Sequence, residues 1–176
     1  MLKKLAIIVV VAIVGVLAYA ATRPDVLRVE RSIAIHAPPE RIFPLVNDYR
    51  QWMAWSPYEA KDPAMSRTFG ATTAGTGATY AWAGNKEVGK GRMTIEASAP
   101  PTRVDMRVDF LEPLATTNKV AFTLAPEAGA TRVTWTMDCP LPFVAKLMQL
   151  VFDLDRIIGA DFETGLANLK HVAEKA

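Results

Sequence analysis

Apolar residues occupy nearly every position from Leu5 to Ala21, and the pattern changes to alternation soon afterwards. No charged residue interrupts this run, and Lys3 and Lys4 precede it. Its length is close to the ~20 residues that cross a bilayer as a helix, and it exceeds the ~7–15 apolar residues of a typical signal peptide. We therefore predict that residues 1–23 form an uncleaved membrane anchor and that residues 24–176 form one soluble domain.

The alternative interpretation of this segment is a secretory signal that is removed after export. The triplet Ala18-Tyr19-Ala20 has the small-x-small pattern that signal peptidase recognises. The two N-terminal lysines favour a cytoplasmic N-terminus, whereas Arg23, Arg28 and Arg31 oppose that orientation. We predict a single-pass protein of the cell membrane with an extracytoplasmic domain, or a secreted domain if cleavage occurs.

The first part of the predicted domain combines a strand with two short helices. Odd-numbered residues from Leu27 to Ile35 share one face of an extended segment, which Pro38 and Pro39 end. Pro39 is well placed in the first turn of a short helix. A second helical piece is expected around residues 49–55, ending before Pro57 because the residue that precedes a proline avoids the helical region.

Five further alternating segments, separated by turns, predict a run of neighbouring antiparallel strands. The apolar residues that share a face within each segment are Tyr80 and Trp82; Met93, Ile95 and Ala97; Val104, Met106, Val108 and Phe110; Val120, Phe122 and Leu124; and Val133, Trp135 and Met137.

From Phe143 onward the apolar positions recur with a helical period, which predicts one long helix over residues 143–175. Such a helix would cover one face of the sheet, so the fold class is α+β. Gly159 and Gly165 are each unfavourable in a helix by up to about 1 kcal/mol relative to alanine. We expect them to mark a bend or a close approach to another element. The apolar stripe consists of Leu147, Val151, Leu154, Ile158, Phe162, Gly165, Leu166, Leu169 and Val172.

Three stretches, Trp55–Glu59, Gly84–Ile95 and Ile158–Lys170, resemble bacterial members of the SRPBCC superfamily. These are START-like proteins often labelled polyketide cyclase or dehydratase-related, and the likeness extends from Val26 to Lys175. It implies a helix-grip fold, in which a curved antiparallel sheet wraps the last helix. Members bind lipids, sterols, quinones or polyketides between sheet and helix, and only some catalyse reactions. The superfamily has no shared catalytic motif to carry over.

The charge balance argues against a nucleic-acid partner. The chain has 20 Lys and Arg against 18 Asp and Glu, and Lys3 and Lys4 account for the difference. The predicted domain is therefore neutral, without the basic stripe that neutralises phosphates. Cys139 is the only cysteine, so an intramolecular disulfide is impossible.

No catalytic constellation, metal site or cofactor is predicted. The only histidines, His36 and His171, are far apart in the sequence, and metal binding needs clustered ligands. No Gly-x-Ser-x-Gly elbow and no P-loop spacing occurs.

Three charged residues remain as possible polar groups of a cavity. Glu87 would act as a base if it lay at the cavity mouth, or it is an exposed hairpin charge paired with Lys86 or Lys90. Asp161 lies near the edge of the apolar stripe, where it would form a partly buried ion pair with Arg31 from the first strand.

The functional hypothesis depends on a set of aromatic and methionine residues on predicted inner faces. Methionines adapt to irregular apolar ligands, and Tyr and Trp add polar groups, although each residue alone is explained by core packing. We predict a tethered, non-catalytic protein that binds an apolar small molecule such as a lipid, quinone or polyketide. The alternatives are an enzyme using Glu87, Tyr80 or Asp161, and an interaction module. The predicted cavity residues are Tyr80, Trp82, Met93, Met106, Phe110, Phe122, Trp135, Met137, Met148, Phe152 and Phe162.

Overall fold

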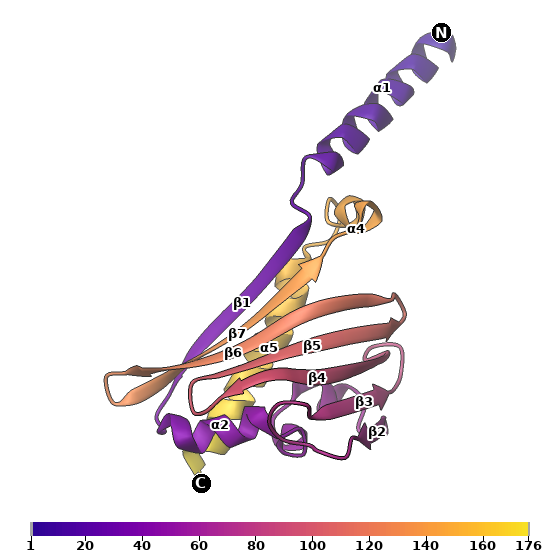
Figure 1. Cartoon of the computed structure of the whole chain (residues 1–176). Coiled ribbons are helices and arrows are strands. Elements are labelled where there is room, and N and C mark those ends of the chain that lie inside the picture. Colours follow the sequence, from indigo (N-terminus) through magenta and orange to yellow (C-terminus); the bar gives the residue numbers. More distant parts are fainter. Residues whose placement is uncertain (1, 176) are drawn as a thin grey trace.

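The computed structural model describes residues 2–175, and its N-terminal helix projects away from the sheet (Figure 1). This helix, α1 (Leu2–Ala21), is exposed along nearly its whole length. By length and composition, its segment Lys3–Ala21 is the one helix among the described residues that is able to cross a membrane.

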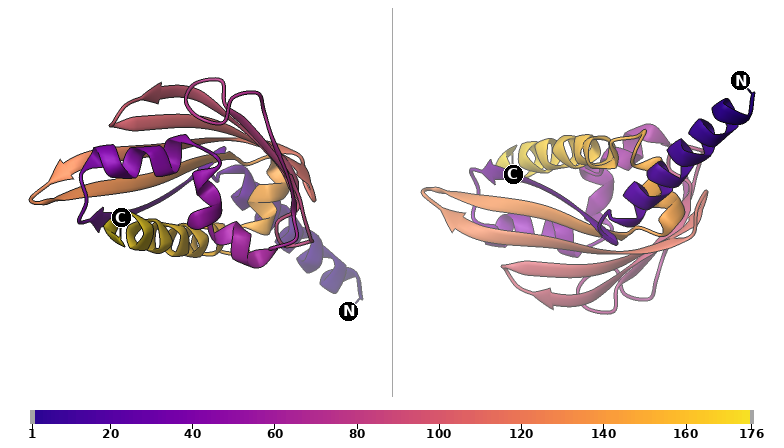
Figure 2. Two further views of the ribbon diagram at one scale, coloured as in Figure 1. Left: turned by 90° about the horizontal axis from the view of Figure 1, so that it is seen from below. Right: turned by 90° about the horizontal axis from the view of Figure 1, so that it is seen from above.

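Seven antiparallel strands form one sheet in the order β1-β7-β6-β5-β4-β3-β2. The first and last strands are neighbours, and Val29 on β1 lies opposite Met137 on β7. Figure 2 shows how the sheet curves over the C-terminal helix. The predicted α+β helix-grip fold is thereby confirmed. The strands are β1 (Val26–Ile35), β2 (Ser66–Phe69), β3 (Thr79–Ala83), β4 (Lys90–Ala99), β5 (Arg103–Glu112), β6 (Thr116–Glu127) and β7 (Ala130–Pro140).

One inward-facing residue was predicted incorrectly because β4 contains an irregularity. The pairing of β4 with β5 shifts between Ile95 and Ala97. A bulge of this kind reverses the side-chain alternation beyond it. Ala97 is therefore exposed, whereas Ser98 is partly buried and its hydroxyl donates to Asn47 Oδ1 at 2.8 Å.

Three short helical segments connect β1 to β2: α2 (Pro39–Asn47), η1 (Gln51–Ala54) and α3 (Pro57–Lys61). The first two agree with the predicted helices. The sequence pattern predicted neither α3 nor β2. Pro57, interpreted as the end of a helix, instead opens the next one, where its missing N–H costs nothing.

The prediction of one continuous helix over residues 143–175 is wrong. This segment forms two helices, α4 (Phe143–Met148) and α5 (Leu154–Lys175). Residues 149–153 connect them. Asp153 Oδ1 accepts the backbone N–H of Arg156 at 3.0 Å, and this is the hydrogen bond that a helix N-cap makes. A new helix therefore begins at this point.

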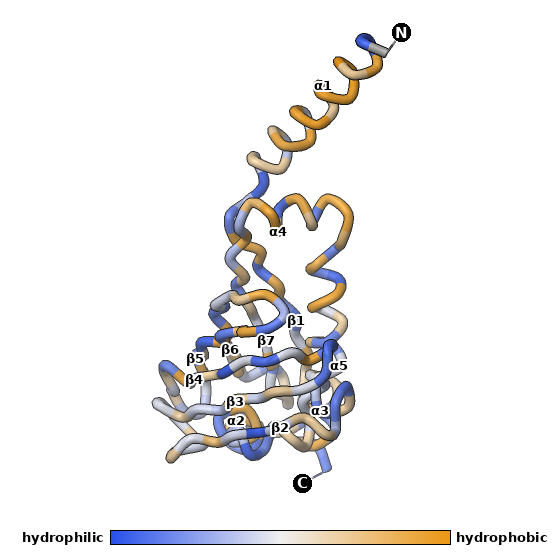
Figure 3. Tube along the Cα trace, turned by 90° about the vertical axis from the view of Figure 1, so that its right-hand side faces the viewer, coloured by the Kyte–Doolittle hydropathy of each residue, from blue (hydrophilic) through white to orange (hydrophobic). Residues whose placement is uncertain are grey.

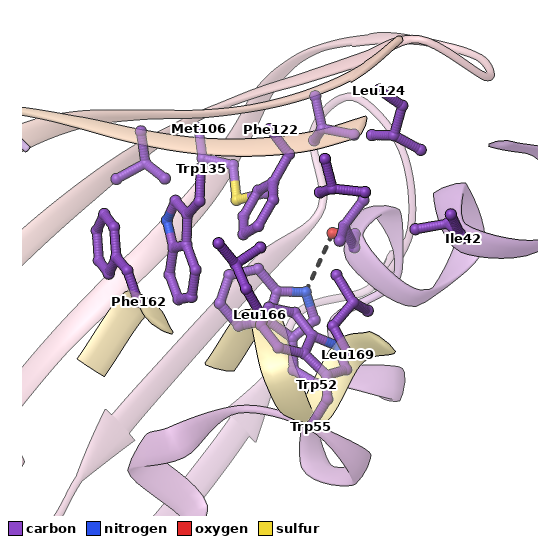
Figure 4. Close-up of a cluster of buried hydrophobic side chains, with 14 of the residues drawn as sticks. Ile42, Trp52, Trp55, Met106, Phe122, Leu124, Trp135, Phe162, Leu166 and Leu169 are labelled. Atoms are coloured by element: carbon purple, nitrogen blue, oxygen red, sulfur yellow. Dashed lines mark hydrogen bonds between the residues drawn. The ribbon is translucent and has the colours of Figure 1, made fainter. Parts of the chain in front are cut away.

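The core lies between the sheet and α5, and the two helical glycines permit close approaches. Trp135 on β7 stacks on Phe162 of α5, with ring centroids 4.0 Å apart (Figure 4). A Cβ atom on Gly165 would lie 2.8 Å from Cζ3 of Trp135, and one on Gly159 would collide with the Arg31 guanidinium. The expectation that these glycines mark close contacts is confirmed.

Candidate ligand-binding cavity

A small cavity of about 80 Å³ lies between the inner face of the sheet, α3 and α5. Its walls are almost entirely apolar. The predicted residues that line it are Tyr80, Trp82, Met93, Phe110, Trp135, Met137 and Phe162. They come from β3, β4, β5, β7 and α5, so the alternation of the strands identified most of the lining that the sheet contributes.

Four predicted residues lie elsewhere, which corrects the predicted site. Met106 and Phe122 point inward but are fully buried in the solid core (Figure 4). Met148 and Phe152 are exposed on α4 and on the segment after it. The break at residues 149–153 explains why Met148 and Phe152 lie outside the cavity, because the apolar stripe does not continue toward it as one helix.

The sequence pattern missed the side of the cavity that α3 and its neighbours form. Ser56, Tyr58 and Glu59 line it there, with Met65 in the loop that follows. Val88, from the turn between β3 and β4, lines it as well. The proline at position 57 was the available signal, since proline favours the first turn of a helix as much as it ends the preceding one.

Trp135, which lines this cavity, has an unpaired hydrogen-bond donor. The other three tryptophan N–H groups each donate to a backbone carbonyl: Trp52 to Val46 at 3.0 Å, Trp55 to Leu45 at 2.8 Å and Trp82 to Val88 at 2.9 Å. Trp135 is only 3% exposed, and its Nε1 atom is buried without a partner. Buried polar groups normally have partners, so this donor is an exception that needs an explanation.

Two tyrosines add hydroxyl groups to the cavity. Burial raises the pKa of Tyr80 to about 12, with a smaller contribution from the negative charge of Glu59. Burial also raises the pKa of Tyr58 above its ordinary value, and the nearby Asp161 contributes to that shift. Both hydroxyls are therefore protonated at neutral pH and are able to donate hydrogen bonds.

Glu59 is the carboxylate in the cavity wall, and an arginine of the neighbouring strand holds it. Arg67 on β2 donates from Nε to Glu59 Oε2 at 3.1 Å, and its Nη2 atom also donates to this oxygen. Both side chains are largely buried. These charge-assisted hydrogen bonds fix the orientation of the carboxylate.

The predicted ion pair between Arg31 and Asp161 is wrong. Arg31 instead pairs with Asp155 at 2.9 Å and with Glu163 at 2.8 Å. Residues 155, 159 and 163 share one face of α5, and Gly159 leaves room there for the guanidinium. Asp161 lies on a different face, where its Oδ2 accepts from Lys61 Nζ at 2.7 Å.

Glu87 is exposed in the turn between β3 and β4 and does not line the cavity. Its predicted partner Lys90 pairs with Glu112 at 2.8 Å instead. We call residues 84–89 the covering turn, because Val88 lies against the cavity. This turn is attached to the end of α3, where the Asn85 backbone N–H donates to Asp62 Oδ2 at 2.7 Å.

Metal binding and thiol chemistry find no support in residues 2–175. Within that range, no group of three or more His, Cys, Asp or Glu side chains is arranged to hold a metal ion. Burial raises the pKa of Cys139 to about 11, so its thiol is protonated at neutral pH.

The fold and the cavity are those of an SRPBCC, START-like protein. Residues 26–174 match the family described as polyketide cyclase / dehydrase and lipid transport. Since this match covers most of the chain, the protein belongs to that family, and the resemblance noted in the sequence is confirmed.

Solved structures show the same fold at low sequence identity. DynU16, a putative protein in the dynemicin biosynthetic locus, is 20% identical with a TM-score of 0.58; the match covers 86% of this chain and 48% of DynU16. Protein CV1439 from Chromobacterium violaceum is 17% identical with a TM-score of 0.59, and the match covers 86% and 99% of the two chains.

The Aha1 dimer protein from Colwellia psychrerythraea is 16% identical with a TM-score of 0.61, and the match covers 84% of this chain and 96% of that protein. This chain spans about half the length of DynU16 but nearly all of the other two. The comparison with curated protein sequences found no match.

Proposed function

We propose that this protein binds an apolar small molecule, such as a lipid, quinone or polyketide-like compound, between the sheet and α5. We further propose that residues 1–23 anchor it in a membrane, while residues 24–176 form the binding domain. The observation that carries the proposal is an apolar cavity lined by Trp135, whose indole N–H has no partner, and by the protonated tyrosines Tyr58 and Tyr80. The family description, which includes lipid transport, supports the same ligand class.

The size of the cavity implies that binding is coupled to a movement. A volume of about 80 Å³ is smaller than the ~300–1,000 Å³ that most small-molecule pockets occupy. Met65, Met93 and Met137 line the cavity, and methionine side chains change shape easily. The covering turn is fastened to α3 by a small number of hydrogen bonds, so its displacement is the simplest way to admit a larger ligand.

The unpaired donor of Trp135 narrows the class of ligand. A buried N–H group without a partner costs about 1–3 kcal/mol, and an acceptor on a bound molecule would recover that cost. We therefore expect a mostly apolar ligand that carries a carbonyl, ether or ester oxygen.

The alternative function is an enzyme of the cyclase or dehydratase type, and Glu59 is the observation that favours it. A carboxylate in an apolar wall has the chemistry of a general base. The pairing with Arg67 opposes this role, because Arg67 already contacts both carboxylate oxygens of Glu59. Replacing Glu59 with Gln separates the two functions, since a binding protein would keep its ligand affinity.

The test of the proposal is ligand binding by the full chain purified in detergent. Native mass spectrometry would detect a co-purified molecule, and fluorescence titration with fatty-acid and quinone analogues would measure affinity. Val108→Trp places a large side chain in the cavity wall and should weaken probe binding by about tenfold or more. Ala128→Trp, on the exposed turn between β6 and β7, is the matched control.

Melting of both variants would be followed in parallel, so that a loss of binding is not confused with unfolding. Leu124 is not a suitable position, because it is buried in the core outside the cavity wall. If no apolar probe binds and no ligand co-purifies, the binding function is wrong, and the interaction module becomes the better hypothesis.

A further inference from the structure

An exposed apolar patch lies on α4 and on the connector that leads to α5. Val144 leaves 67% of its surface exposed and Val151 leaves 78%. Figure 3 shows this hydrophobic segment at the end of the molecule from which α1 departs. We define the docking patch as Phe143, Val144, Met148, Val151 and Phe152.

The patch carries no charge of its own, although α4 contains a lysine. Lys146 is only 7% exposed, and its Nζ atom lies 2.6 Å from Asp25 Oδ1, just before β1. The ammonium group is thus paired with the segment that leads into β1 and is not part of the exposed apolar face. A short helix that buries its only cation and exposes its apolar residues is unusual for a surface in contact with water.

The position of α1 indicates what covers the patch. The end of α1 lies against α4, and Ala20 of α1 is fully buried there. Tyr19 and Arg23 at the same end contact each other, with the guanidinium 5.8 Å from the ring centroid. Tyrosine and arginine are typical of the level where a membrane-spanning helix leaves the bilayer. If α1 spans a bilayer, α4 is thereby brought to the depth of the lipid headgroups.

A second feature at this level suits a lipid surface. Arg23 lines a cleft of about 540 Å³ between the connector and the start of β1. Its Nε atom is buried without a protein partner. A guanidinium group in this situation is complementary to an anionic phosphate oxygen.

We infer that the docking patch inserts into the surface of the bilayer that α1 crosses. The protein then has two membrane contacts, a spanning helix and an interfacial segment that lies in the headgroup region. The second contact fixes the orientation of the sheet and α5 relative to the bilayer, which the single linker at residues 22–25 would not do. This inference rests on the proposed role of α1 as an anchor.

The experiment measures how deeply the patch enters the membrane. Single cysteines at positions 144, 151 and 128, each in a Cys139→Ala background, would carry an environment-sensitive fluorophore. The full chain would be reconstituted in vesicles of phosphatidylcholine and phosphatidylglycerol. Lipid-borne spin labels and aqueous iodide then serve as quenchers, and circular dichroism checks that each variant is folded.

We expect lipid-borne quenchers to reduce the fluorescence at positions 144 and 151 by about twofold or more, and iodide to have little effect there. Position 128, on the exposed turn between β6 and β7, should show the reverse. Quenching of 144 and 151 by iodide alone would overturn the inference, because the patch would face water. Protection from both quenchers would overturn it too, since a second protein copy would then cover the patch.

The outcome is independent of ligand binding in the cavity. The labels report only the surroundings of α4 and the connector, and probe affinity is measured separately in detergent. A protein that binds no apolar probe but shows lipid quenching at position 144 would disprove the binding function and support the docking patch.

Discussion

At the scale of single residues, Trp135 combines a packing role with an unused hydrogen-bond donor. It stacks on Phe162 with an angle of 6° between the rings, and it lines the cavity. Replacing Trp135 with Ala should lower the free energy of unfolding by about 3–5 kcal/mol, because a large cavity would remain. Trp135→Phe should cost less, since it retains a ring and removes an unsatisfied donor.

Thermal and urea unfolding of the full chain in detergent would measure both changes. The same pair of variants tests the proposed ligand class. Trp135→Phe should weaken the binding of a probe with a carbonyl oxygen and leave a pure hydrocarbon probe unaffected. Equal losses for both probes would show that the N–H group makes no bond to the ligand.

Gly165 allows a close approach that any larger residue would prevent. In an exposed helix position, Gly→Ala is stabilising by about 1 kcal/mol. At position 165 the added Cβ would lie 2.8 Å from Trp135 and 3.0 Å from Pro57, and neither ring can move away easily. Gly165→Ala should therefore lower the free energy of unfolding by about 1–3 kcal/mol in spite of the gain in helix propensity.

Ala167→Gly, at an exposed site on the same helix, is the control that measures propensity alone. Urea unfolding of the two variants and the parent protein separates the contribution of helix propensity from the cost of crowding at position 165. A Gly165→Ala protein more stable than the parent would mean that α5 shifts without penalty.

At the scale of elements, we propose that the covering turn between β3 and β4 controls the entrance to the cavity, because Val88 lines it. Asp62 Oδ2 accepts the Asn85 N–H, and Asp62 Oδ1 accepts the Ala64 N–H at 3.1 Å. Asp62→Ala should release the turn and increase the association rate of an apolar probe by severalfold, because opening precedes binding.

Glu87→Ala is the matched control within the same turn, since Glu87 is exposed and lines no cavity. In stopped-flow fluorescence, the Glu87→Ala variant should bind the apolar probe at the same association rate as the parent protein. A slower rate for Glu87→Ala would place this carboxylate at the cavity entrance. An unchanged rate for Asp62→Ala would place the entrance elsewhere.

At the scale of the whole molecule, α1 is the element from which we predict where the protein resides. Its apolar surface is exposed over a length that matches a bilayer span, so transfer into lipid is strongly favourable. We expect the protein to stay in the membrane fraction during alkaline carbonate washing, with its N-terminus intact. Recovery in the soluble fraction with a new N-terminus near Ala21 would establish the cleaved, secreted form instead.

The sequence alone determined most of the elements and, apart from the end of β4, which side of the longer strands faces inward. Side-chain alternation is local, so Val104, Met106 and Val108 were placed on the buried face without knowledge of their partners. The apolar stripe of α5 and the close contacts of Gly159 and Gly165 followed in the same way from helical periodicity. Local capping chemistry at Asp153 would also have revealed the break between α4 and α5.

Only the tertiary structure decided which inward residues border empty space. Phe122 and Trp135 occupy equivalent positions on neighbouring strands, yet Phe122 is in the solid core and Trp135 lines the cavity. The difference arises from how α3 and α5 lie over the sheet, which no local pattern encodes. Ion pairing is decided in the same way, because Arg31 meets the face of α5 that contains Asp155 and Glu163, while Asp161 faces α3.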